Sequence, residues 1–444
     1  MTTADPVLAS RPTIDPVRWP DLAASRAKVR RGVESAVARQ LFRSAVKRLA
    51  VRVEAGDQVF GGGAHDPGAP VMRLVRPEAF YAAVGSKALI GFGESYMAGD
   101  WDSPDLAGLL EVFAAQMATL IPAPLQRLRA LYVARHPSSE RNTTRNTRSN
   151  IARHYDLSND LFATFLDDTL SYSSALFDAP AQRVASVSGE TALVSPAPAA
   201  PTWPDLRVAQ ERKIDRILDA ARVGDGTRVL EIGSGWGELA IRAAARGATV
   251  LTVTLSSEQQ ELARERVAAA GYSDRVDVEL LDYRAVQGEF DAVVSVEMIE
   301  AVGHQYWKDY FRTIDRVLAP GGSVAIQAIT MPHDRMLVTR NTYTWINKYI
   351  FPGGFLPSTE ALADVTREHT RLRLTERLSF GRHYAETLRL WDERYLGALD
   401  AVHRLGFDEV FDRMWHFYLQ YSEAGFRSGY LDVQQLVFRR EVTA

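Results

Sequence analysis

The alternation of short apolar runs with amphipathic stretches after Arg228 is the feature that most constrains how this chain can fold. Runs such as RVLEIG at 228–233 and FDAVVSVE at 290–297 have the length and the β-branched content of buried strands, whereas 256–271 has the composition of a helix. Strands that alternate with helices predict an α/β unit, in which a mostly parallel sheet carries helices on both faces. A strand at 432–439 is expected to close it.

The length of the chain, 444 residues, predicts more than one domain. Residues 1–25 are rich in proline and alanine without periodicity and are expected to be disordered. A smaller α+β domain is expected at 26–135, and a polar linker at 136–150 separates it from the α/β domain at 151–444. Within that domain, 186–204 is rich in Ala, Pro and Ser and is expected to form a flexible surface insertion.

The net charge of −3 hides two strongly basic segments. Residues 26–52 hold nine Lys or Arg against one acid, and 127–153 hold seven Arg against one acid. Between 26 and 50, apolar residues recur every four positions, which predicts a basic amphipathic helix. Such segments are typical of surfaces that meet anions, namely nucleic acid, an anionic membrane or an acidic ligand. Pairing with the acidic rest of the chain, or across a homodimer, is the alternative.

Several classes of site and location are excluded or disfavoured. The chain has no cysteine, which excludes disulfides, thiolate metal ligands and a cysteine nucleophile, and no metal site is expected. The first 30 residues lack the continuous apolar run of a secretory signal. The longest nearly uncharged stretch of the N-terminal third, 106–125, is too broken by Glu111 and two prolines to span a bilayer. We expect a cytoplasmic protein that is peripherally associated with the inner face of the membrane.

A glycine-rich turn follows the first strand of the α/β domain and carries Gly233, Gly235 and Gly237. Glycines there let the backbone approach a ligand closely and turn into the next helix. The spacing is G-x-G-x-G, not the G-x-G-x-x-G of dinucleotide sites. Glu231, two residues before the first glycine, suits the ammonium group of S-adenosylmethionine. A glycine-rich turn without a ligand is the alternative.

The ends of the next two strands offer further cofactor contacts. No acid follows the second strand directly, and Thr254 and Gln259 are expected to bind the ribose instead. Ser256 and Glu258 could equally cap the following helix, and both roles are compatible. Asp282–Tyr283, after the third strand, is placed for contacts to the adenine.

Several runs, in the same order along the chain, resemble the cyclopropane-fatty-acyl-phospholipid synthase and mycolic acid methyltransferase family. They are GFGESYMAGDW (91–101), HYDLSNDLF (154–162), SYSSALF (171–177), VLEIGSGWG (229–237), VTLSSEQQ (253–260), SVEMIEAVG (295–303), WINKYIFPGG (345–354) and GFRSG…VQQLVFRR (425–440). The resemblance extends from roughly residue 70 to the end, so it is far more specific than one glycine loop.

The resemblance implies methyl transfer from S-adenosylmethionine to the double bond of an unsaturated acyl chain on a phospholipid. It also implies a Rossmann-like class I methyltransferase domain, with a mostly parallel seven-stranded sheet, and a smaller N-terminal lipid-binding domain. The cofactor contacts of the family carry over to Tyr172, Ser173, Gly233, Gly235, Thr254, Gln259, Asp282 and Tyr283.

The catalytic positions depart from the family pattern. In the cyclopropane-forming relatives a bound bicarbonate takes the proton, and it is held by a Cys, a Gly backbone, a Glu, a His and a Tyr. Glu300 and Tyr384 match, but Ser174 stands for the Cys, Glu297 for the Gly and Gln327 for the His. A carboxylate at 297 would repel an anion beside it, so we expect no bicarbonate and a base function for Glu297 itself. A purely structural role of Glu297 is the alternative.

Methyl transfer to an alkene leaves a carbocation, which aromatic faces stabilise through cation–π attraction. The aromatic candidates, which core packing could equally explain, are Tyr172, Trp345, Tyr349, Phe351 and Tyr384, with Tyr384 and then Tyr172 foremost. A relocated base favours a methyl- or methylene-branched chain, with a reductase acting on the product. A cyclopropane product stays open.

Other classes of function stay open as alternatives. One is a small-molecule methyltransferase on the same fold, against which the basic helix and the GESYM segment argue. Another is a non-catalytic lipid-binding protein, against which the retained glycine loop, Glu300 and Tyr384 argue. A nucleic-acid partner is not expected, because no target-base motif accompanies the basic segments.

Overall fold

A computed structural model is the basis for the description of this protein. It describes residues 8, 11–27, 32–116 and 158–441. The basic segment at 127–153 and the expected linker at 136–150 lie outside the described residues, as does the start of the first basic segment.

The chain divides into two compact units, each assembled from separate stretches of sequence. The first unit comprises Met1–Arg135, Thr342–Ile350 and Trp391–Tyr430, and the second comprises His136–Asn341, Phe351–Leu390 and Leu431–Ala444. The expected organisation, with one continuous domain at 151–444, differs from this result. Two stretches of the C-terminal half belong to the N-terminal unit.

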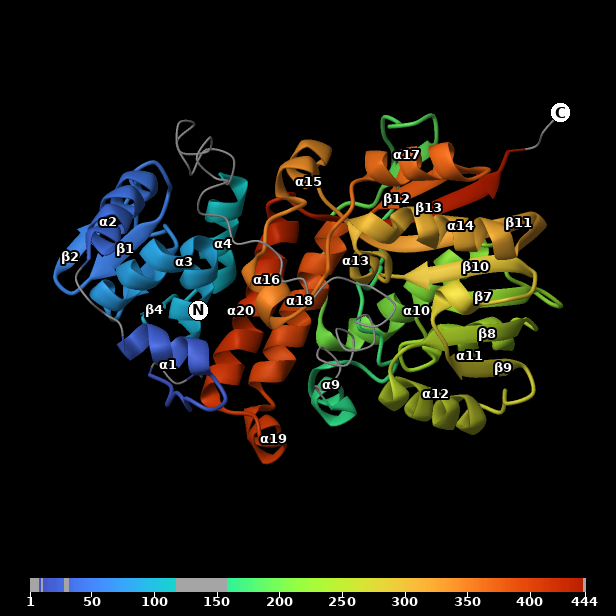
Figure 1. Ribbon diagram of the computed structural model, residues 1–444, viewed down its shortest axis with the longest axis horizontal. Helices are drawn as coiled ribbons and strands as arrows, with labels where there is room; N and C mark the ends of the chain where they lie inside the picture. The colour runs from blue at the N-terminus through green and yellow to red at the C-terminus, as the bar shows by residue number, and fades with distance from the viewer. Residues whose placement is uncertain (1–7, 9–10, 28–31, 117–157, 442–444) are drawn as a thin grey trace. The chain divides into compact units, whose positions relative to one another are not determined.

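The second unit is built on a sheet that has nine strands within the described residues (Figure 1). In spatial order they are β5 (Gln182–Arg183), β6 (Thr191–Val194), β12 (Leu372–Ser379), β13 (Asp432–Arg440), β11 (Leu318–Thr330), β10 (Phe290–Val296), β7 (Arg228–Ile232), β8 (Thr249–Thr254) and β9 (Val276–Leu280). From β11 to β9 all neighbours are parallel, and β13 is antiparallel to both of its neighbours. The expected mostly parallel seven-stranded sheet is therefore present, with the β5–β6 hairpin added at its edge.

That hairpin corrects the expectation of a flexible insertion at 186–204. β6 pairs in parallel with β12 and so extends the sheet. Glu190, just before β6, forms a buried ion pair with Arg377 of β12, with Oε1 and Nε 3.2 Å apart. The alanine- and proline-rich composition did not reveal a short strand, because its pairing partner lies far away in the sequence.

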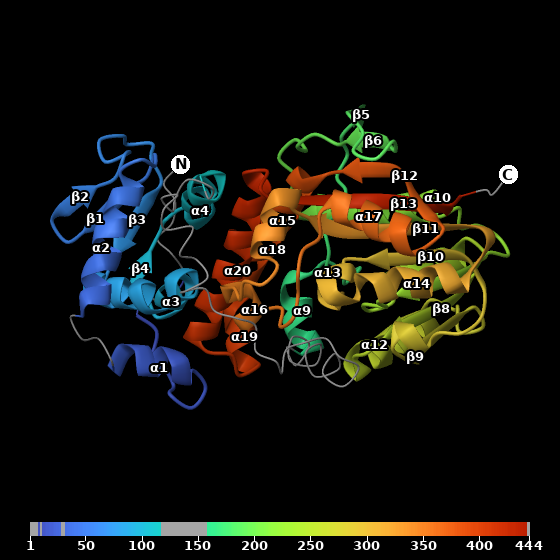
Figure 2. The same cartoon turned by 45° about the horizontal axis from the view of Figure 1, so that its top comes forward.

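Helices cover both faces of this sheet, as the alternation predicts (Figure 2). On one face α10 (Trp203–Ala220), α11 (Glu238–Ala245) and α12 (Ser257–Ala269) pack with strand residues such as Val229 and Val294. On the other face α14 (Trp307–Val317) and α17 (Thr359–His369) pack with the alternate strand residues, such as Leu230 and Val293. This alternation is the two-residue period of a strand. Further helices of the unit are α9 (Asn159–Phe165), η2 (Tyr283–Ala285), α13 (Ile299–Val302), η3 (His304–Tyr306) and α15 (His333–Thr339).

The first unit combines a small sheet with helices. Within the described residues its strand order is β2 (Gln58–Phe60), β1 (Arg52–Ala55), β3 (Val71–Leu74) and β4 (Trp101–Asp102). Its helices are α1 (Pro20–Ala27), α2 (Val33–Val46), α3 (Pro77–Met97), α4 (Leu106–Ala115), α16 (Trp345–Tyr349), α19 (Leu399–Arg404) and α20 (Glu409–Arg427). Helix α1 begins inside the stretch 1–25 that was expected to be disordered, and its Leu22 is buried.

Buried polar groups explain why distant stretches join this unit. The carboxylate of Glu94 in α3 accepts hydrogen bonds from Lys348, at 2.6 Å, and from the hydroxyl of Tyr349, at 2.9 Å. The buried guanidinium of Arg413 in α20 donates to the backbone oxygen of Tyr96, at 2.7 Å. A buried charge is costly unless it is paired, so these contacts hold α16 and α20 within the unit.

Candidate active site

The candidate site lies at the carboxyl edge of the parallel strands. Gly233 follows β7, Thr254 ends β8, and Glu297 follows β10. Because parallel strands end at the same edge of a sheet, the topology brings these residues together, in the crevice where α/β sheets bind ligands. The order in the sheet, β10-β7-β8, makes the three strands direct neighbours.

The glycine loop has a backbone that requires glycine. Gly233, Gly235 and Gly237 have φ angles of 98°, 48° and 91°, in the left-handed region that other residues rarely adopt. A Cβ added at Gly233 would lie 2.3 Å from Cγ of Met298. A Cβ at Gly235 would meet no described atom within 4 Å, so this side of the loop is open for a ligand.

Glu231 has the properties expected of a partner for a cationic ligand. It lies on β7 and is buried, and its Oε2 has no hydrogen-bond partner among the described residues. Burial raises the pKa of this carboxyl to about 8. A bound ammonium group would satisfy the oxygen and restore the ionised form. The residues present therefore fit the amino-acid end of S-adenosylmethionine.

The other expected cofactor residues have mixed surroundings. Thr254 donates its hydroxyl to Oε1 of Gln259, at 2.9 Å, at the end of β8. Ser256 caps α12 by accepting from the backbone N–H of Gln259, so the capping role that the sequence left open is present. Asp282 pairs with Arg284, whereas the ring of Tyr283 is buried against Tyr310 in the core of the unit. The structure thus gives Tyr283 a packing role, and its contribution to an adenine site stays a prediction.

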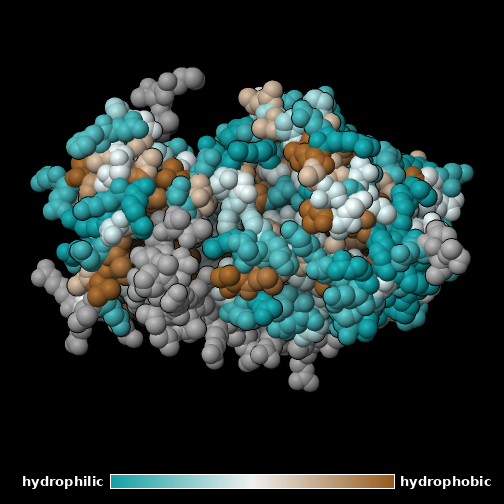
Figure 3. All heavy atoms as spheres, turned by 90° about the horizontal axis from the view of Figure 1, so that it is seen from above, coloured by the Kyte–Doolittle hydropathy of each residue, from teal (hydrophilic) through white to brown (hydrophobic). Residues whose placement is uncertain are grey.

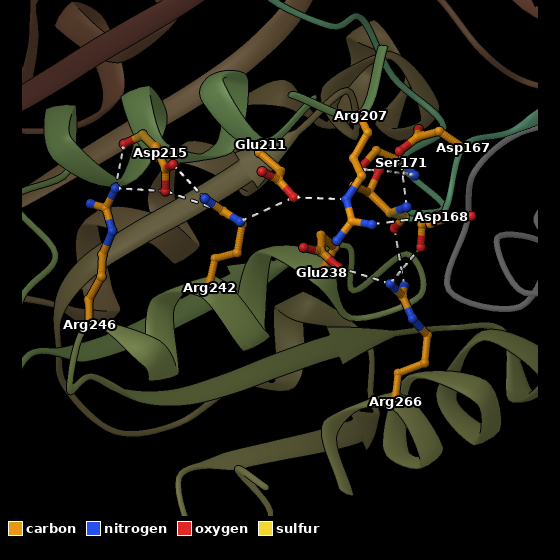
Figure 4. Close-up of polar contacts among 11 residues, drawn as sticks. Asp167, Asp168, Ser171, Arg207, Glu211, Asp215, Glu238, Arg242, Arg246 and Arg266 are labelled. Carbon is orange, nitrogen blue, oxygen red and sulfur yellow. Dashed lines mark hydrogen bonds and ion pairs between the residues drawn. The ribbon is translucent and has the colours of Figure 1, made fainter. Parts of the chain in front are cut away.

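Arg266 of α12 fixes the loop that carries Tyr172 and Ser173 (Figure 4). Its guanidinium donates to the backbone oxygens of Thr169, at 3.1 Å, and of Trp236, at 2.8 Å, and so joins this loop to the glycine turn. The ring of Tyr172 packs against Phe162, with centroids 4.9 Å apart. Both predicted cofactor residues are therefore held close to the glycine loop, and their contact with the cofactor stays a prediction.

The carboxylate of Glu297 is the centre of a hydrogen-bonded cluster. Its Oε2 accepts from the hydroxyl of Tyr384, at 2.7 Å; Tyr384 lies on α18 (Gly381–Leu396). Its Oε1 accepts from the backbone N–H of Ser174, at 3.0 Å, and from Nε2 of Gln327, at 2.9 Å. Four of the five predicted catalytic residues, namely Glu297, Ser174, Gln327 and Tyr384, thus meet at this carboxylate. The fifth is Glu300. Hydrogen bonds of this kind favour an ionised carboxylate, whereas its burial is the larger effect and raises the pKa of Glu297.

Two local details refine the predicted roles. Glu297 has a φ of 51°, a left-handed conformation for which the glycine of the family pattern would be the natural residue. The strain indicates that its carboxylate is held in place by the surrounding donors. The hydroxyl of Ser174 donates to the backbone oxygen of Ala175, at 3.0 Å, so this residue serves Glu297 with its backbone rather than its side chain.

Glu300, on α13, is the second acid of the cluster. One oxygen accepts from the backbone N–H of Ile329, and its Oε2 has no hydrogen-bond partner within the described part of the chain. Burial, and then the nearby Glu297, raise the pKa of Glu300 to about 8. At neutral pH Glu300 is therefore protonated, and the hydrogen bonds to Glu297 lower the pKa of that carboxyl against the larger effect of its burial.

The raised pKa of Glu300 predicts a pH-dependent stability. A carboxyl group whose pKa is higher in the folded state takes up protons on folding between about pH 4.5 and pH 8, so the free energy of unfolding falls as the pH rises through this range. The side chain of Glu300→Gln cannot ionise, so the free energy of unfolding of this variant should fall less as the pH rises. The unfolding temperatures of both proteins are measured at pH 5.5 and pH 8.5. Relative to the wild type, the variant is expected to be more stable at pH 8.5 than at pH 5.5. An equal difference at both pH values would contradict a buried, protonated Glu300.

Two of the aromatic candidates have core roles. The rings of Trp345 and Phe417 lie 4.8 Å apart, and the hydroxyl of Tyr349 donates to Glu94, all within the first unit. Packing, which the sequence left open, accounts for these two. Tyr384 is buried beside Glu297 and keeps its predicted place in the site.

Sequence reasoning missed Lys213 and Gln435. Both are buried, and both belong to the hydrogen bonds around Glu297. Lys213 follows Leu206, Ala209 and Gln210 on the buried face of α10. A lysine on the apolar stripe of a helix is the signal that could have identified it.

Comparisons with known proteins identify the family of the chain. The family model for mycolic acid cyclopropane synthetase matches residues 142–436. A tuberculostearic acid methyltransferase of Mycobacterium tuberculosis is 53% identical over 432 residues, which are 96% of each chain. The cyclopropane-fatty-acyl-phospholipid synthase of Escherichia coli K12 is 32% identical and covers 84% of this chain and 89% of its own.

A solved structure provides the link to the cofactor. The mycolic acid cyclopropane synthase CmaA1, complexed with SAH, superimposes with a TM-score of 0.56 at 28% identity, over 66% of this chain and 98% of that chain. The chain therefore belongs to the mycolic acid cyclopropane synthetase family and is an S-adenosylmethionine-dependent methyltransferase.

Proposed function

We propose that this enzyme methylates the double bond of an unsaturated acyl chain of a membrane phospholipid, and that Glu297 is the base that completes the reaction. The hydrogen-bonded carboxylate of Glu297 carries this proposal. It is half-buried, strained in its backbone, and held by Ser174, Gln327 and Tyr384. An internal carboxylate with these donors can accept a proton at a stated atom without a bound anion.

The cofactor would be held by residues that fit it. S-adenosylmethionine supplies an electrophilic methyl group when it is bound. Glu231 offers a buried carboxylate to its ammonium, and the open side of Gly235 offers the backbone for close approach. An alkene has no proton to lose before it attacks, so a base is needed only after the methyl group has been transferred.

The proposed product is a methyl- or methylene-branched chain. The π electrons of the alkene form the new C–C bond and leave a cation on the other alkene carbon. A hydride shift brings the cation to the branched carbon, and loss of a methyl proton to Glu297 gives an exocyclic methylene. A relative named for tuberculostearic acid, a saturated methyl-branched acid, supports a branched product. Saturation needs a hydride donor, so we propose that a reductase acts on the product.

Lipids from cells that express the chain and are fed methionine with a fully deuterated methyl group would test the proposal. A methylene branch retains two of the three deuterium atoms, whereas a methyl branch on a shifted double bond retains three. A cyclopropane also retains two, so NMR has to separate it from the methylene. Cyclopropyl signals would contradict the branched product, and unlabelled lipids would contradict the methyltransferase activity on acyl chains.

We also propose that helix α2 docks on an anionic membrane surface, from which the acyl chain is drawn. The expected stripe of residues at every fourth position is only partly buried: Val37 and Leu41 are 50% and 42% exposed. Ala38 and Val46 are buried instead, because α2 packs against α3. The exposed pair thus remains available for an interface.

The charge and the hydropathy of this face support docking rather than insertion. Lys47, the C-cap of α2, and Arg48, the next residue, are both exposed. Apolar surface beside basic charge is typical of interfacial binding, with about 1 kcal/mol for each Lys or Arg near an anionic surface. Exposed hydrophobic residues form only small groups on the face in Figure 3. In the described parts of the chain, no helix has the length and hydropathy that a membrane span requires.

Sedimentation with vesicles would test this docking. Lys47→Ser with Arg48→Ser is expected to weaken binding to anionic vesicles about tenfold or more, since each charge contributes about 1 kcal/mol. Changing Arg30 and Arg31, which lie outside the described residues, to Ser as well is expected to weaken this binding further. The control is Arg207→Ser with Arg228→Ser, which removes the same charge from the second unit. Binding that is equal for neutral and anionic vesicles would contradict the electrostatic part.

A further inference from the structure

Lys213 is a buried cation next to the proposed catalytic base. It lies on α10, its side chain is almost entirely shielded from solvent, and its Nζ donates to Oγ of Ser173, at 2.7 Å. Neither the glycine motif nor the family's catalytic positions include it. A lysine is almost never fully buried unless it is paired, so its place requires an explanation.

A closed ring of hydrogen bonds joins Lys213 to Glu297. On one side, Nζ of Lys213 holds Ser173, and the backbone N–H of the next residue, Ser174, donates to Oε1 of Glu297. On the other side, Nε2 of Gln435 donates to the backbone oxygen of Lys213, at 3.0 Å, and to Oε1 of Gln327, at 3.1 Å. Gln327 then donates to the same oxygen of Glu297, at 2.9 Å. The side chain of Lys213 thus positions the Ser174 donor, whereas the backbone oxygen of Lys213 supports the Gln327 donor.

The helix that carries Lys213 is fixed on its other side by ion pairs with α11 (Figure 4). Arg242 and Arg246 both pair with Asp215 of α10, at 2.6 and 3.0 Å. Partly buried pairs that form a network hold a helix more firmly than an isolated surface pair does. The backbone of Lys213 is therefore a stable support for the ring.

The charge of Lys213 acts in the same direction as its hydrogen bonds. The groups that face Glu297 are Glu300 of α13, Tyr384 of α18, Gln327 of β11 and Lys213 of α10. Of these, Lys213 is the cation, and its charge lowers the pKa of Glu297 against the effect of burial. Its charge also faces the buried Asp167 and Glu231, and burial lowers the pKa of Lys213 itself to about 8.

We infer that Lys213 is a positioning residue for the reaction, whose side chain aligns the Ser174 donor on Glu297 through Ser173 and whose charge keeps this carboxylate ionised. The inference rests on the proposed function, because it gives Lys213 a role only through Glu297. Lys213 does not touch the acyl chain in this scheme. Its loss should therefore change the pH dependence of turnover rather than abolish the chemistry.

The pH dependence of kcat in Lys213→Met tests the inference. An opposite charge a few ångströms away shifts a pKa by about 1 unit or more, so the acidic limb of the profile should move up by about one pH unit, and kcat at a fixed pH on that limb should fall about tenfold. Lys213→Arg keeps the positive charge, so the acidic limb of its pH profile should lie close to that of the wild type. Arg212→Met, which removes a cation from the neighbouring position of α10, is the matched control and should leave the limb in place.

A second neutral variant keeps the test decisive if Lys213→Met does not fold. Lys213→Gln retains a donor for Ser173 but lacks the charge, so its acidic limb should move in the same direction. An acidic limb that coincides with that of the wild type in the folded neutral variant would overturn the inference. Glu297→Gln is measured in parallel. Full activity of that variant would refute the proposed base, whereas an inactive Glu297→Gln with an unmoved limb in the Lys213 variants refutes only the role of Lys213.

Discussion

Replacing Glu297 by glutamine is expected to lower kcat by about 10²- to 10⁴-fold, the usual contribution of a general base. The amide oxygen can still accept from the N–H of Ser174 and from Gln327, and the amide N–H₂ would face the hydroxyl of Tyr384 as a donor, but the amide cannot take a proton. The step before proton removal is unaffected, so the affinity for S-adenosylmethionine should not change. Turnover measured on phospholipid vesicles, with calorimetry for the cofactor, would check both parts.

A chemical rescue makes this prediction sharper. Glu297→Gly removes the carboxylate and leaves the N–H of Ser174, the amide of Gln327 and the hydroxyl of Tyr384 without their acceptor. Added bicarbonate can accept from the same donors, so it should restore part of the activity of Glu297→Gly. It should not help Glu297→Gln, in which the side chain fills the place. The glycine also removes the strain of a φ of 51°, so the variant should fold.

The wild-type enzyme is the control for this rescue. Its activity should not depend on bicarbonate, because the internal carboxylate already occupies the donors. A wild-type enzyme that loses activity in carbonate-depleted buffer and regains it on addition of bicarbonate would contradict the internal base. A fully active Glu297→Gln would assign the proton transfer to another group.

Replacing Gly235 by valine is expected to weaken S-adenosylmethionine binding by at least about 100-fold, or about 2.7 kcal/mol. The added Cβ meets no described protein atom, so the steric conflict is with the ligand alone. The φ of 48° adds strain, which lowers stability but leaves the sheet intact. Calorimetric titration with S-adenosylmethionine would measure the loss.

Gly226 offers a matched control for the effect of strain. It has a φ of 73°, it lies just before β7, and a Cβ there also meets no described atom within 4 Å. Gly226→Val should therefore lose a comparable amount of stability and keep its cofactor affinity. Equal losses of affinity in the two variants would mean that strain, not the proximity of the ligand, explains the effect at Gly235.

The α/β fold and the cofactor loop were predictable because their determinants are local. The apolar, β-branched run at 290–297 and the helix-favouring composition of 256–271 are properties of the sequence alone. The glycines of the loop follow a strand and begin a helix, which is sufficient to place them at the ligand-binding edge of a parallel sheet. The identities of Glu297, Gln327 and Ser174 followed from their place in a family pattern.

The arrangement around Glu297 required the tertiary structure, because its partners come from distant elements. Lys213 and Gln435 lie far apart in the sequence and meet through hydrogen bonds that no local period encodes. The hydroxyl of Ser174 turned out to face Ala175, and only the backbone geometry shows that its N–H is the useful donor. A side chain's donor direction depends on packing, which the residue type does not state.

For the organisation of the chain, too, some features follow from the sequence and others only from the tertiary structure. The sequence by itself determined the sheet, its carboxyl edge and the amphipathic character of α2, since these depend on periodicity and on turn residues. Only the tertiary structure decided that α16 and α20 join the N-terminal unit, that β6 extends the sheet, and that Val37 and Leu41 stay exposed. The physical reason is that burial and strand pairing require two surfaces in contact. A single stretch of sequence contains only one of those two surfaces.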